Sequence, residues 1–275
     1  MKKSNKNAIE NQYAQSRLYE DIIDRLVGQG INLNEVTRSN LSGVDEFHIR
    51  GIEVSNELAN LTNLRNKKVL DIGSGLGGPC RMLADQYNCD AYGIDLSTDY
   101  IETAKKLSDL VTVNGTTKFS VGDALNLPFK DKSFDVVWTQ HVQMNIKDKF
   151  RFYSEINRVL SEDGMFIYYD IFQHDPIEIN YPVPWANNSS VSFLQTIENM
   201  EANLGGLGFV KHHTTNQTDK GLEFLENVMH SNKLTNSNTI GLNILLGNRT
   251  EEKFNNLLNA LQCGKIELQS GIYNK

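Results

Sequence analysis

The sequence predicts an α/β fold in which helices cover both faces of a doubly wound, mostly parallel sheet. From residue 67 onward, short apolar runs bounded by turn residues alternate with segments of helical periodicity. The runs are apolar throughout rather than alternating, which is typical of strands buried on both faces. The expected strands are Lys67–Ile72, Asp90–Ile94, Lys118–Val121, Phe134–Trp138 and Gly164–Ile171. The helices expected between them are Pro79–Tyr87, Thr98–Leu107 and Lys147–Leu160.

The segments on either side of this core are predicted to be mainly helical. Helical spacing of apolar residues indicates a helix near 9–27, after a disordered tail, and a second near 54–61, after a polar link. Beyond Asp170 we expect a proline-containing loop at 174–190, a helix at 196–204, a strand at 208–213, mostly helix over 216–262 and a last strand at 265–273. We therefore divide the chain into an N-terminal helical lid segment (1–65), a core (66–173), a substrate-binding loop and helical insertion with one core strand (174–262) and a final core strand (263–275).

Composition limits the classes of partner. The 275 residues are 39% hydrophobic and carry a formal charge of −7, which disfavours nucleic acid as a substrate. The three cysteines form no CxxC pair, so neither a metal site nor a disulfide framework is expected. No segment reads as a signal peptide or a membrane span, and we expect a cytoplasmic protein that does not bind membranes. A homo-oligomer is possible, because the sequence does not indicate the oligomeric state.

A glycine-rich turn follows the first predicted strand, in the run Val69-Leu70-Asp71-Ile72-Gly73-Ser74-Gly75-Leu76-Gly77-Gly78. Such a turn lets a ligand approach the backbone at Gly73, Ser74 and Gly75, and the following helix offers unpaired N–H groups. Gly73, Gly75 and Gly78 also satisfy the G-x-G-x-x-G dinucleotide pattern. By itself, the turn is equally compatible with a dinucleotide, with another cofactor or with no ligand.

Three aspartates sharpen the choice of ligand. Asp71 ends the first strand, where a carboxylate can face a cationic amino acid group but repels a pyrophosphate. Asp95, followed by Leu96, ends the second strand at the spacing expected for a ribose contact. Asp123, followed by Ala124, comes after the third strand, where it can accept from an adenine amino group or simply cap a turn. Together they predict S-adenosylmethionine (SAM) as the cofactor.

Longer motifs extend this prediction. The segments VLDIGSGLGG, YGIDLS, VGDALNLPF, SFDVVWTQHVQMNI and EINRVLSEDGMFIYYDI resemble class I SAM-dependent methyltransferases over residues 67–171. DEFHIRG, YPVPWA, IGLNILLG and GKIELQSGIY look like a bacterial subgroup similar to sarcosine/dimethylglycine N-methyltransferases. The resemblance implies a Rossmann-like core of seven strands, the last one antiparallel. It also implies a small-molecule acceptor methylated on nitrogen, carbon or oxygen.

The segment after the fourth strand is expected at the carboxyl edge of the sheet, beside the crevice where strand order reverses. The resemblance implies that Gln140 contacts SAM, and that His141 and Gln143 face the acceptor. His141 is the best candidate for a general base, because an imidazole titrates near neutral pH. The alternative is that His141 only packs against or orients a neighbour.

Two further segments are predicted to reach the acceptor. The resemblance implies that the segment containing His48 folds over the SAM pocket, although a solvated loop histidine is equally compatible with the sequence. Tyr181 and Trp185 flank two prolines in a loop that offers aromatic surfaces to an apolar or cationic acceptor, or that is only clamped to the core. A compact glycine derivative would also need a cation for its carboxylate, and Arg38, Arg50 and Arg249 are candidates.

The sequence thus favours a methyltransferase that transfers the SAM methyl group to a small molecule by in-line displacement in an enclosed pocket. Two other functions stay open at this point. One is an NAD-dependent oxidoreductase, which the carboxylate of Asp71 opposes. The other is a protein that binds SAM without catalysis, which the sequence does not distinguish from an enzyme.

Overall fold

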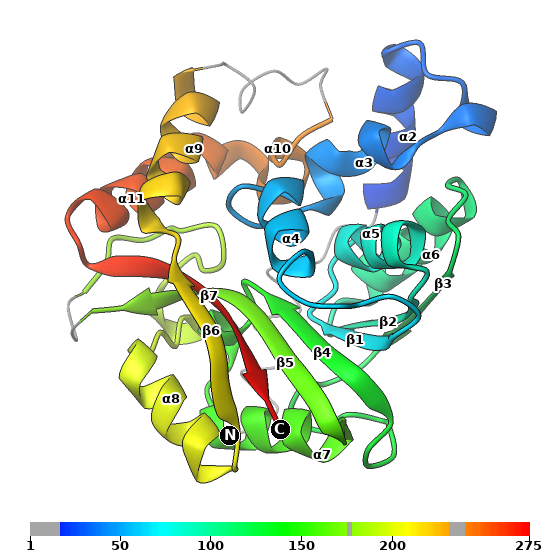
Figure 1. Cartoon of the computed structure of the whole chain (residues 1–275). Coiled ribbons are helices and arrows are strands. Elements are labelled where there is room, and N and C mark those ends of the chain that lie inside the picture. Colours follow the sequence, from blue (N-terminus) through cyan, green and yellow to red (C-terminus); the bar gives the residue numbers. More distant parts are fainter. Residues whose placement is uncertain (1–16, 175–177, 231–239) are drawn as a thin grey trace.

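The computed structural model describes residues 17–174, 178–230 and 240–275 (Figure 1). The strands are β1 (Lys68–Ile72), β2 (Asp90–Asp95), β3 (Thr116–Val121), β4 (Phe134–Gln140), β5 (Leu160–Gln173), β6 (Val210–Asn216) and β7 (Ile266–Asn274). The helices are α2 (Leu18–Gly28), α3 (Arg38–Asp45), α4 (Ile52–Ala59), α5 (Gly78–Tyr87), α6 (Thr98–Asp109), α7 (Lys149–Val159), α8 (Ile197–Gly206), α9 (Thr218–His230), α10 (Asn243–Leu246) and α11 (Thr250–Gln262). None of these helices is long and apolar enough to cross a membrane.

The strands form one seven-stranded sheet in the order β3-β2-β1-β4-β5-β7-β6. β1 to β5 pair in parallel, and β7 runs antiparallel between β5 and β6. The predicted Rossmann-like sheet with an antiparallel last strand is therefore confirmed. Strand order reverses between β1 and β4, which makes their carboxyl ends the place where such folds bind ligands.

Two apolar layers sandwich the sheet, because successive side chains of a strand point to opposite faces. On β5, Ile167, Tyr169 and Ile171 face a core shared with α4, α5, α9 and α11. The alternate residues Phe166 and Tyr168 face a second core shared with α7 and α8. Figure 1 shows α7 and α8 on the other side of the sheet from α9 and α11. The continuous apolar runs of the sequence are explained by this burial on both faces.

The N-terminal helices α2 and α3 pack against the α/β core and do not form a separate unit. Apolar side chains of α2 and α3 share a cluster with α6, with α10 and with Leu76 of the glycine-rich turn. In Figure 1 these N-terminal helices (blue) and α10 (orange) both lie above the carboxyl ends of the strands. Residues from both ends of the chain thus cover the same end of the sheet.

The predicted polar link at 28–40 is partly wrong, because α3 begins at Arg38 inside it and a 3-10 turn occupies Leu33–Glu35. The helix was hidden by its mean polarity, since only Leu41 and Val44 are its buried apolar residues. Thr37 and Asn40 start it with a reciprocal capping box, a local signal that was present in the sequence. The predicted tail and the first part of the 9–27 helix lie outside the described residues, and α2 begins at Leu18.

A buried ion pair fastens α3 to the core. Nη2 of Arg81 on α5 lies 2.8 Å from Oδ2 of Asp45, and both side chains are at most 4% exposed. The same guanidinium donates to the carbonyl oxygen of Leu76 and, at 2.9 Å, to Oγ of Ser108 on α6. One side chain therefore joins α3, the glycine-rich turn and α6. The carboxylate of Asp45 depends on it for charge compensation.

We predict that Arg81→Leu lowers the free energy of unfolding by about 3 kcal/mol, because it leaves the Asp45 carboxylate buried without its partner. Urea-induced unfolding followed by circular dichroism measures this loss. Arg249→Leu is the matched control, because its pair with Glu252 has both side chains about half exposed (54% and 52%). The control should cost less than about 1 kcal/mol. Equal losses in the two variants would contradict the role of Arg81.

Candidate active site

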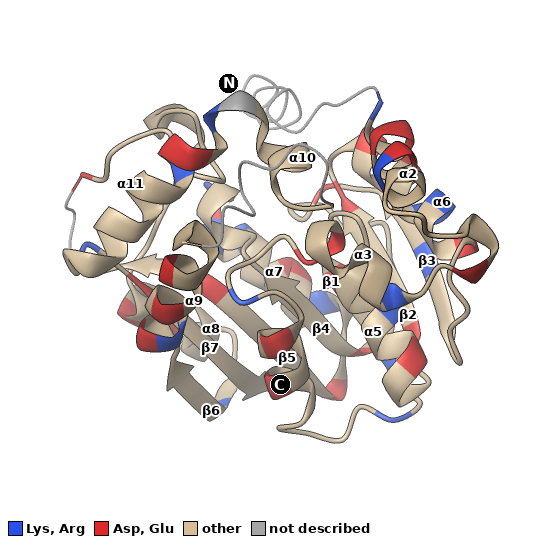
Figure 2. Cartoon of the chain, turned by 90° about the horizontal axis from the view of Figure 1, so that it is seen from above, with Lys and Arg blue, Asp and Glu red and all other residues tan. Residues whose placement is uncertain are grey.

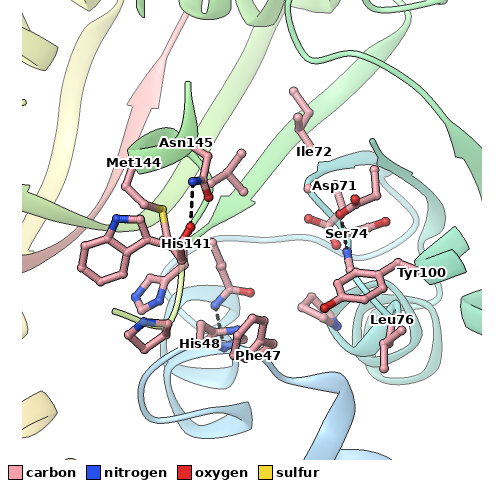
Figure 3. A pocket seen from close by; sticks show the side chains of 18 of the residues that line it. Phe47, His48, Asp71, Ile72, Ser74, Leu76, Tyr100, His141, Met144 and Asn145 are labelled. Carbon is pink, nitrogen blue, oxygen red and sulfur yellow. Dashed lines mark hydrogen bonds between the residues drawn. The ribbon is translucent and has the colours of Figure 1, made fainter. Parts of the chain in front are cut away.

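The candidate active site is a cavity at the carboxyl ends of β1, β2 and β4, where strand order reverses. Figure 3 shows Asp71, Ser74 and Tyr100 on one side of this cavity, and His141, Met144 and Asn145 on the other. Phe47 and His48, from the segment between α3 and α4, also line it. Residues from the 174–262 part of the chain complete the lining: Pro184, Trp185, Phe224, Leu242, Phe254 and Leu257.

The glycine-rich turn forms the floor of one end. Gly73 has φ +73°, and a Cβ there would lie 2.5 Å from Cγ2 of Val142, so only glycine lets the loop after β4 approach. Gly75 has φ +52°, and a Cβ there would meet no atom within 4 Å. Its backbone therefore lies open to a ligand. Oγ of Ser74 is buried and has no hydrogen-bond partner among the described residues. An open backbone edge and an unsatisfied hydroxyl fit a polar ligand at this place.

Asp71 is a buried carboxyl group at the end of β1, 2% exposed. The pKa of Asp71 is raised to about 7, mainly because the group is buried; a hydrogen bond from Sγ of Cys80 opposes the rise, and nearby Asp95 contributes to it. A cationic group beside Asp71 would favour its charged form. The turn that follows β1 thus lies beside a buried acid for which the described residues provide no ion pair, and its backbone is open to a ligand.

Asp95 has both oxygens fixed by the backbone. Its Oδ2 accepts from N–H of Gly75 at 3.0 Å, and its Oδ1 accepts from N–H of Ser97 at 2.9 Å. Each oxygen keeps a lone pair, so the carboxylate is oriented and can still accept from two neighbouring hydroxyls. Leu96 lines the cavity beside it. This geometry fits the predicted ribose contact.

Asp123 is placed differently from the other two aspartates. Its Oδ1 accepts from N–H of Leu125 at 2.9 Å, which is the turn-capping arrangement. The cavity is lined by its neighbours Gly122 and Ala124, not by Asp123 itself. A contact from Asp123 to an adenine amino group stays a prediction, while Ala124 lies where it was expected.

Gln140 ties the N-terminal segment to β4. Its Oε1 accepts from Nε1 of Trp138 at 2.8 Å, and its Nε2 lies 3.2 Å from Oγ of Ser55 and 3.1 Å from Nε2 of His48. Burial lowers the pKa of His48 to about 4, so its ring is neutral at physiological pH. Both residues line the cavity. His48 is therefore a buried wall residue and not a solvated loop histidine.

His141 follows β4 directly and has a positive φ of +52°. Its backbone N–H donates to the carbonyl oxygen of Tyr169 at 2.8 Å. The next two amides, of Val142 and Gln143, both donate to Oδ2 of Asp170 at 3.0 Å. These bonds hold the turn that places the imidazole against the cavity.

The His141 ring has one unused nitrogen. Its Nε2 is buried and has no hydrogen-bond partner in the part of the chain that the structure describes. Burial, and next the neighbouring His48 ring, hold the pKa of His141 well below its usual range. The imidazole is therefore neutral at physiological pH, and it can bind a polar group of a ligand.

Two predicted acceptor contacts do not line this cavity. Gln143 is 3% exposed, and its Oε1 accepts from Nε2 of Gln195 at 2.8 Å and from Oη of Tyr153. The side chain of Gln143 is buried beneath the loop that follows β4, because the backbone N–H of Gln143 is bound to Asp170. Tyr181 lines a separate shallow hollow with Phe193. Asn145 takes the expected place of Gln143 on the cavity wall.

Trp185 lines the cavity as predicted. Val183 and Ala186 exchange two backbone hydrogen bonds, of 2.8 and 3.1 Å, which close a tight turn around Pro184 and Trp185. The indole Nε1 donates to Oγ of Ser192 at 3.0 Å, and Nδ2 of Asn145 donates to the carbonyl oxygen of Trp185 at 3.0 Å. The turn thus fixes the indole face.

The three arginines that might grip a carboxylate are engaged elsewhere. Nη1 of Arg50 lies 3.0 Å from Oε2 of Glu57, Nε of Arg38 lies 3.1 Å from Oδ2 of Asp85, and Arg249 pairs with Glu252. Among the residues that the structure describes, no lysine or arginine lines the cavity. Figure 2 shows the charged residues of both signs spread over the surrounding helices.

Sequence reasoning missed most of the apolar wall. Phe224 on α9 and Phe254 and Leu257 on α11 line the cavity, although nothing distinguishes them in sequence from other apolar residues of amphipathic helices. Tyr100 lies on α6, and only the helix was predicted. Phe47 could have been predicted, because it stands next to His48 in the motif DEFHIRG.

The fold and site can now be compared with known proteins. Residues 70–168 match the family model described as a methyltransferase domain. The chain is 36% identical over 130 residues to a tocopherol O-methyltransferase of Arabidopsis thaliana, a match that covers 46% of this chain and 37% of the relative. It is 36% identical over 126 residues to norajmaline N-methyltransferase of Rauvolfia serpentina, which covers 45% and 43%. The matches therefore span less than half of each relative.

A crystal structure of a protein from Galdieria sulphuraria, provisionally named a sarcosine dimethylglycine methyltransferase, shares the fold. Its TM-score is 0.66 at 16% identity, and the superposition covers 93% of this chain and 98% of that one. The comparisons thus show the fold of the chain and a methyltransferase domain over residues 70–168. They leave the acceptor open.

We predict that the affinity for SAM falls as pH drops below about 7. Protonation of Asp71 removes the charge that attracts a cation, so the dissociation constant should rise by up to about tenfold per pH unit. His48, whose pKa is lowered to about 4, stays neutral over this range and does not mask the effect. Titration calorimetry between about pH 8 and pH 5.5 measures it. Asp71→Asn should bind more weakly and lose the pH dependence; a flat wild-type profile would refute the assignment.

Proposed function

We propose that the chain binds SAM in this cavity and transfers its methyl group to a small-molecule acceptor. The observation that carries the proposal is a single cavity with two chemically different ends. Acidic groups and open backbone lie at the end formed by Asp71, Ser74 and Gly75, while His141 and Trp185 lie at the other. SAM has a cationic amino acid end, ribose hydroxyls and a reactive methyl group between them. These features match the first end and point the methyl group toward the second.

The residues then have separate roles. Asp71 faces the cationic end of the cofactor, Asp95 with Leu96 holds the ribose, and Gly73, Ser74 and Gly75 supply the backbone edge. Gln140 lies on the cavity wall between cofactor and acceptor and positions the His48 ring there, while Trp138 fixes its own amide group. SAM supplies an electrophilic methyl group on a sulfonium, so the protein must mainly align the acceptor and exclude water.

We further infer that residues 1–65 and 174–262 act together as the lid over the acceptor. Phe47 and His48 approach the cavity from the first segment, and Trp185 and Phe254 approach it from the second. Arg81 fixes the first segment through Asp45. The enclosure supports a selective pocket for a small molecule rather than a groove for a nucleic acid.

Binding of SAM is the direct test of this proposal. Titration calorimetry of the purified chain with SAM and with NAD should give heat for SAM alone. Asp95→Ala should weaken SAM binding by roughly 1–3 kcal/mol, because the bonds to two ribose hydroxyls are lost. Glu102→Ala is the control, because Glu102 is exposed on the same stretch of chain, on α6, and should leave the affinity unchanged. NAD binding without SAM binding would overturn the proposal in favour of an oxidoreductase.

A further inference from the structure

The end of the cavity opposite the glycine-rich turn has an almost wholly apolar wall. We call it the acceptor chamber and define it by the side chains Met144, Ile171, Trp185, Phe224, Phe254 and Leu257. They come from the loop after β4, from β5, from the loop before α8, and from α9 and α11. Five separate parts of the chain thus contribute apolar side chains to one compartment.

We propose that the acceptor is a neutral, largely apolar molecule with one hydroxyl group, and that this hydroxyl binds His141. The inference rests on the proposed methyl transfer and narrows its substrate class. It excludes carboxylated amines such as sarcosine, which the sequence motifs had brought into consideration. The composition of the wall, its charge and the unpartnered Nε2 of His141 support it independently of the sequence motifs.

The charges around the chamber disfavour an anionic acceptor. The charged residues that line the cavity in the described part of the chain are Asp45, Asp71 and Asp95, all acidic. Lys253 precedes Phe254 on α11, but its Nζ donates to the carbonyl oxygen of Leu246 at 3.2 Å and is not on the lining. A carboxylate or phosphate would enter apolar surroundings in which the described lining residues offer it no counter-ion.

The polar groups near the chamber leave one unused site. Nδ2 of Asn145 is engaged by the carbonyl oxygens of Trp185 and Val191, at 3.0 and 2.8 Å. Nε2 of His141 is buried and without a partner among the described residues. The His141 ring is further held against Tyr169, with 4.9 Å between ring centroids. A buried, neutral imidazole nitrogen needs one hydrogen-bond partner, a donor or an acceptor according to its tautomer, and a hydroxyl can serve as either.

The proposed step balances with SAM as the only co-reactant. The hydroxyl oxygen forms a bond to the methyl carbon, the carbon–sulfur bond breaks, and its electron pair goes to sulfur. The hydroxyl proton passes to Nε2 of His141 and then to solvent. An oxygen that is forming a third bond becomes strongly acidic, so a weakly basic, buried imidazole is sufficient to accept the proton. A neutral amine would need no such base, which favours oxygen over nitrogen.

The test compares a neutral aromatic alcohol, the carboxylate on the same ring system and a small zwitterionic amine. The chain is first loaded with S-adenosylhomocysteine, and 2-naphthol, 2-naphthoate and sarcosine are then titrated calorimetrically at neutral pH. We expect 2-naphthol to bind at least about tenfold more tightly than 2-naphthoate, and sarcosine to give no heat. Equal or tighter binding of 2-naphthoate, binding of sarcosine, or no binding of 2-naphthol to the loaded chain would each overturn the inference.

Variants assign the binding to the acceptor chamber. Phe254→Ala should weaken 2-naphthol about tenfold while S-adenosylhomocysteine affinity stays constant, and Phe150→Ala, 59% exposed on α7, should change neither. His141→Ala should weaken 2-naphthol but not 2-methoxynaphthalene, which lacks the donor. An unchanged 2-naphthol affinity in both cavity variants would contradict the placement. If the wild-type chain does not bind S-adenosylhomocysteine at all, the proposed function fails, which is a separate outcome.

Discussion

The buried guanidinium of Arg81 is the constraint on which the site geometry depends. It binds Asp45 at the end of α3, Leu76 in the glycine-rich turn and Ser108 on α6, so three segments must meet around one charge. Asp45 is followed directly by the residues that reach the cavity, Phe47 and His48. The lid segment is therefore positioned by an ionic contact to the helix that starts at the cofactor end, and not by apolar packing alone.

The two ends of the cavity follow from the order of the strands. β1 and β4 are neighbours at the point where strand order reverses, so the turns that follow these two strands lie side by side. Gly73 permits this approach by leaving room for Val142. An acidic end and an imidazole end are thus brought within one enclosure, which is what transfer between a cationic donor and a neutral acceptor requires.

The sheet, the approximate positions of its strands and the glycine-rich end were predictable, because each is encoded locally by apolar runs, glycines and strand-ending aspartates. The strand bounds were less exact, since β5 begins at Leu160 and not at Gly164. The acceptor end was predictable only in part: His141 and Trp185 line the cavity, while Gln143 and Tyr181 do not. The position of Gln143 depends on its bonds to Asp170 and Gln195, which join residues distant in sequence. Phe224 and Phe254 reach the cavity through tertiary packing, which a helical pattern does not encode.

The central claim is that one cavity holds the cofactor at the glycine-rich end and leaves the acceptor chamber free. A crystal structure of the chain with S-adenosylhomocysteine tests it most directly. The account predicts ribose hydroxyls on Asp95, the amino acid group beside Asp71, and the sulfur facing His141 and the acceptor chamber. An adenosine group packed against Trp185 and Phe254, or a ligand bound outside this cavity, would contradict it.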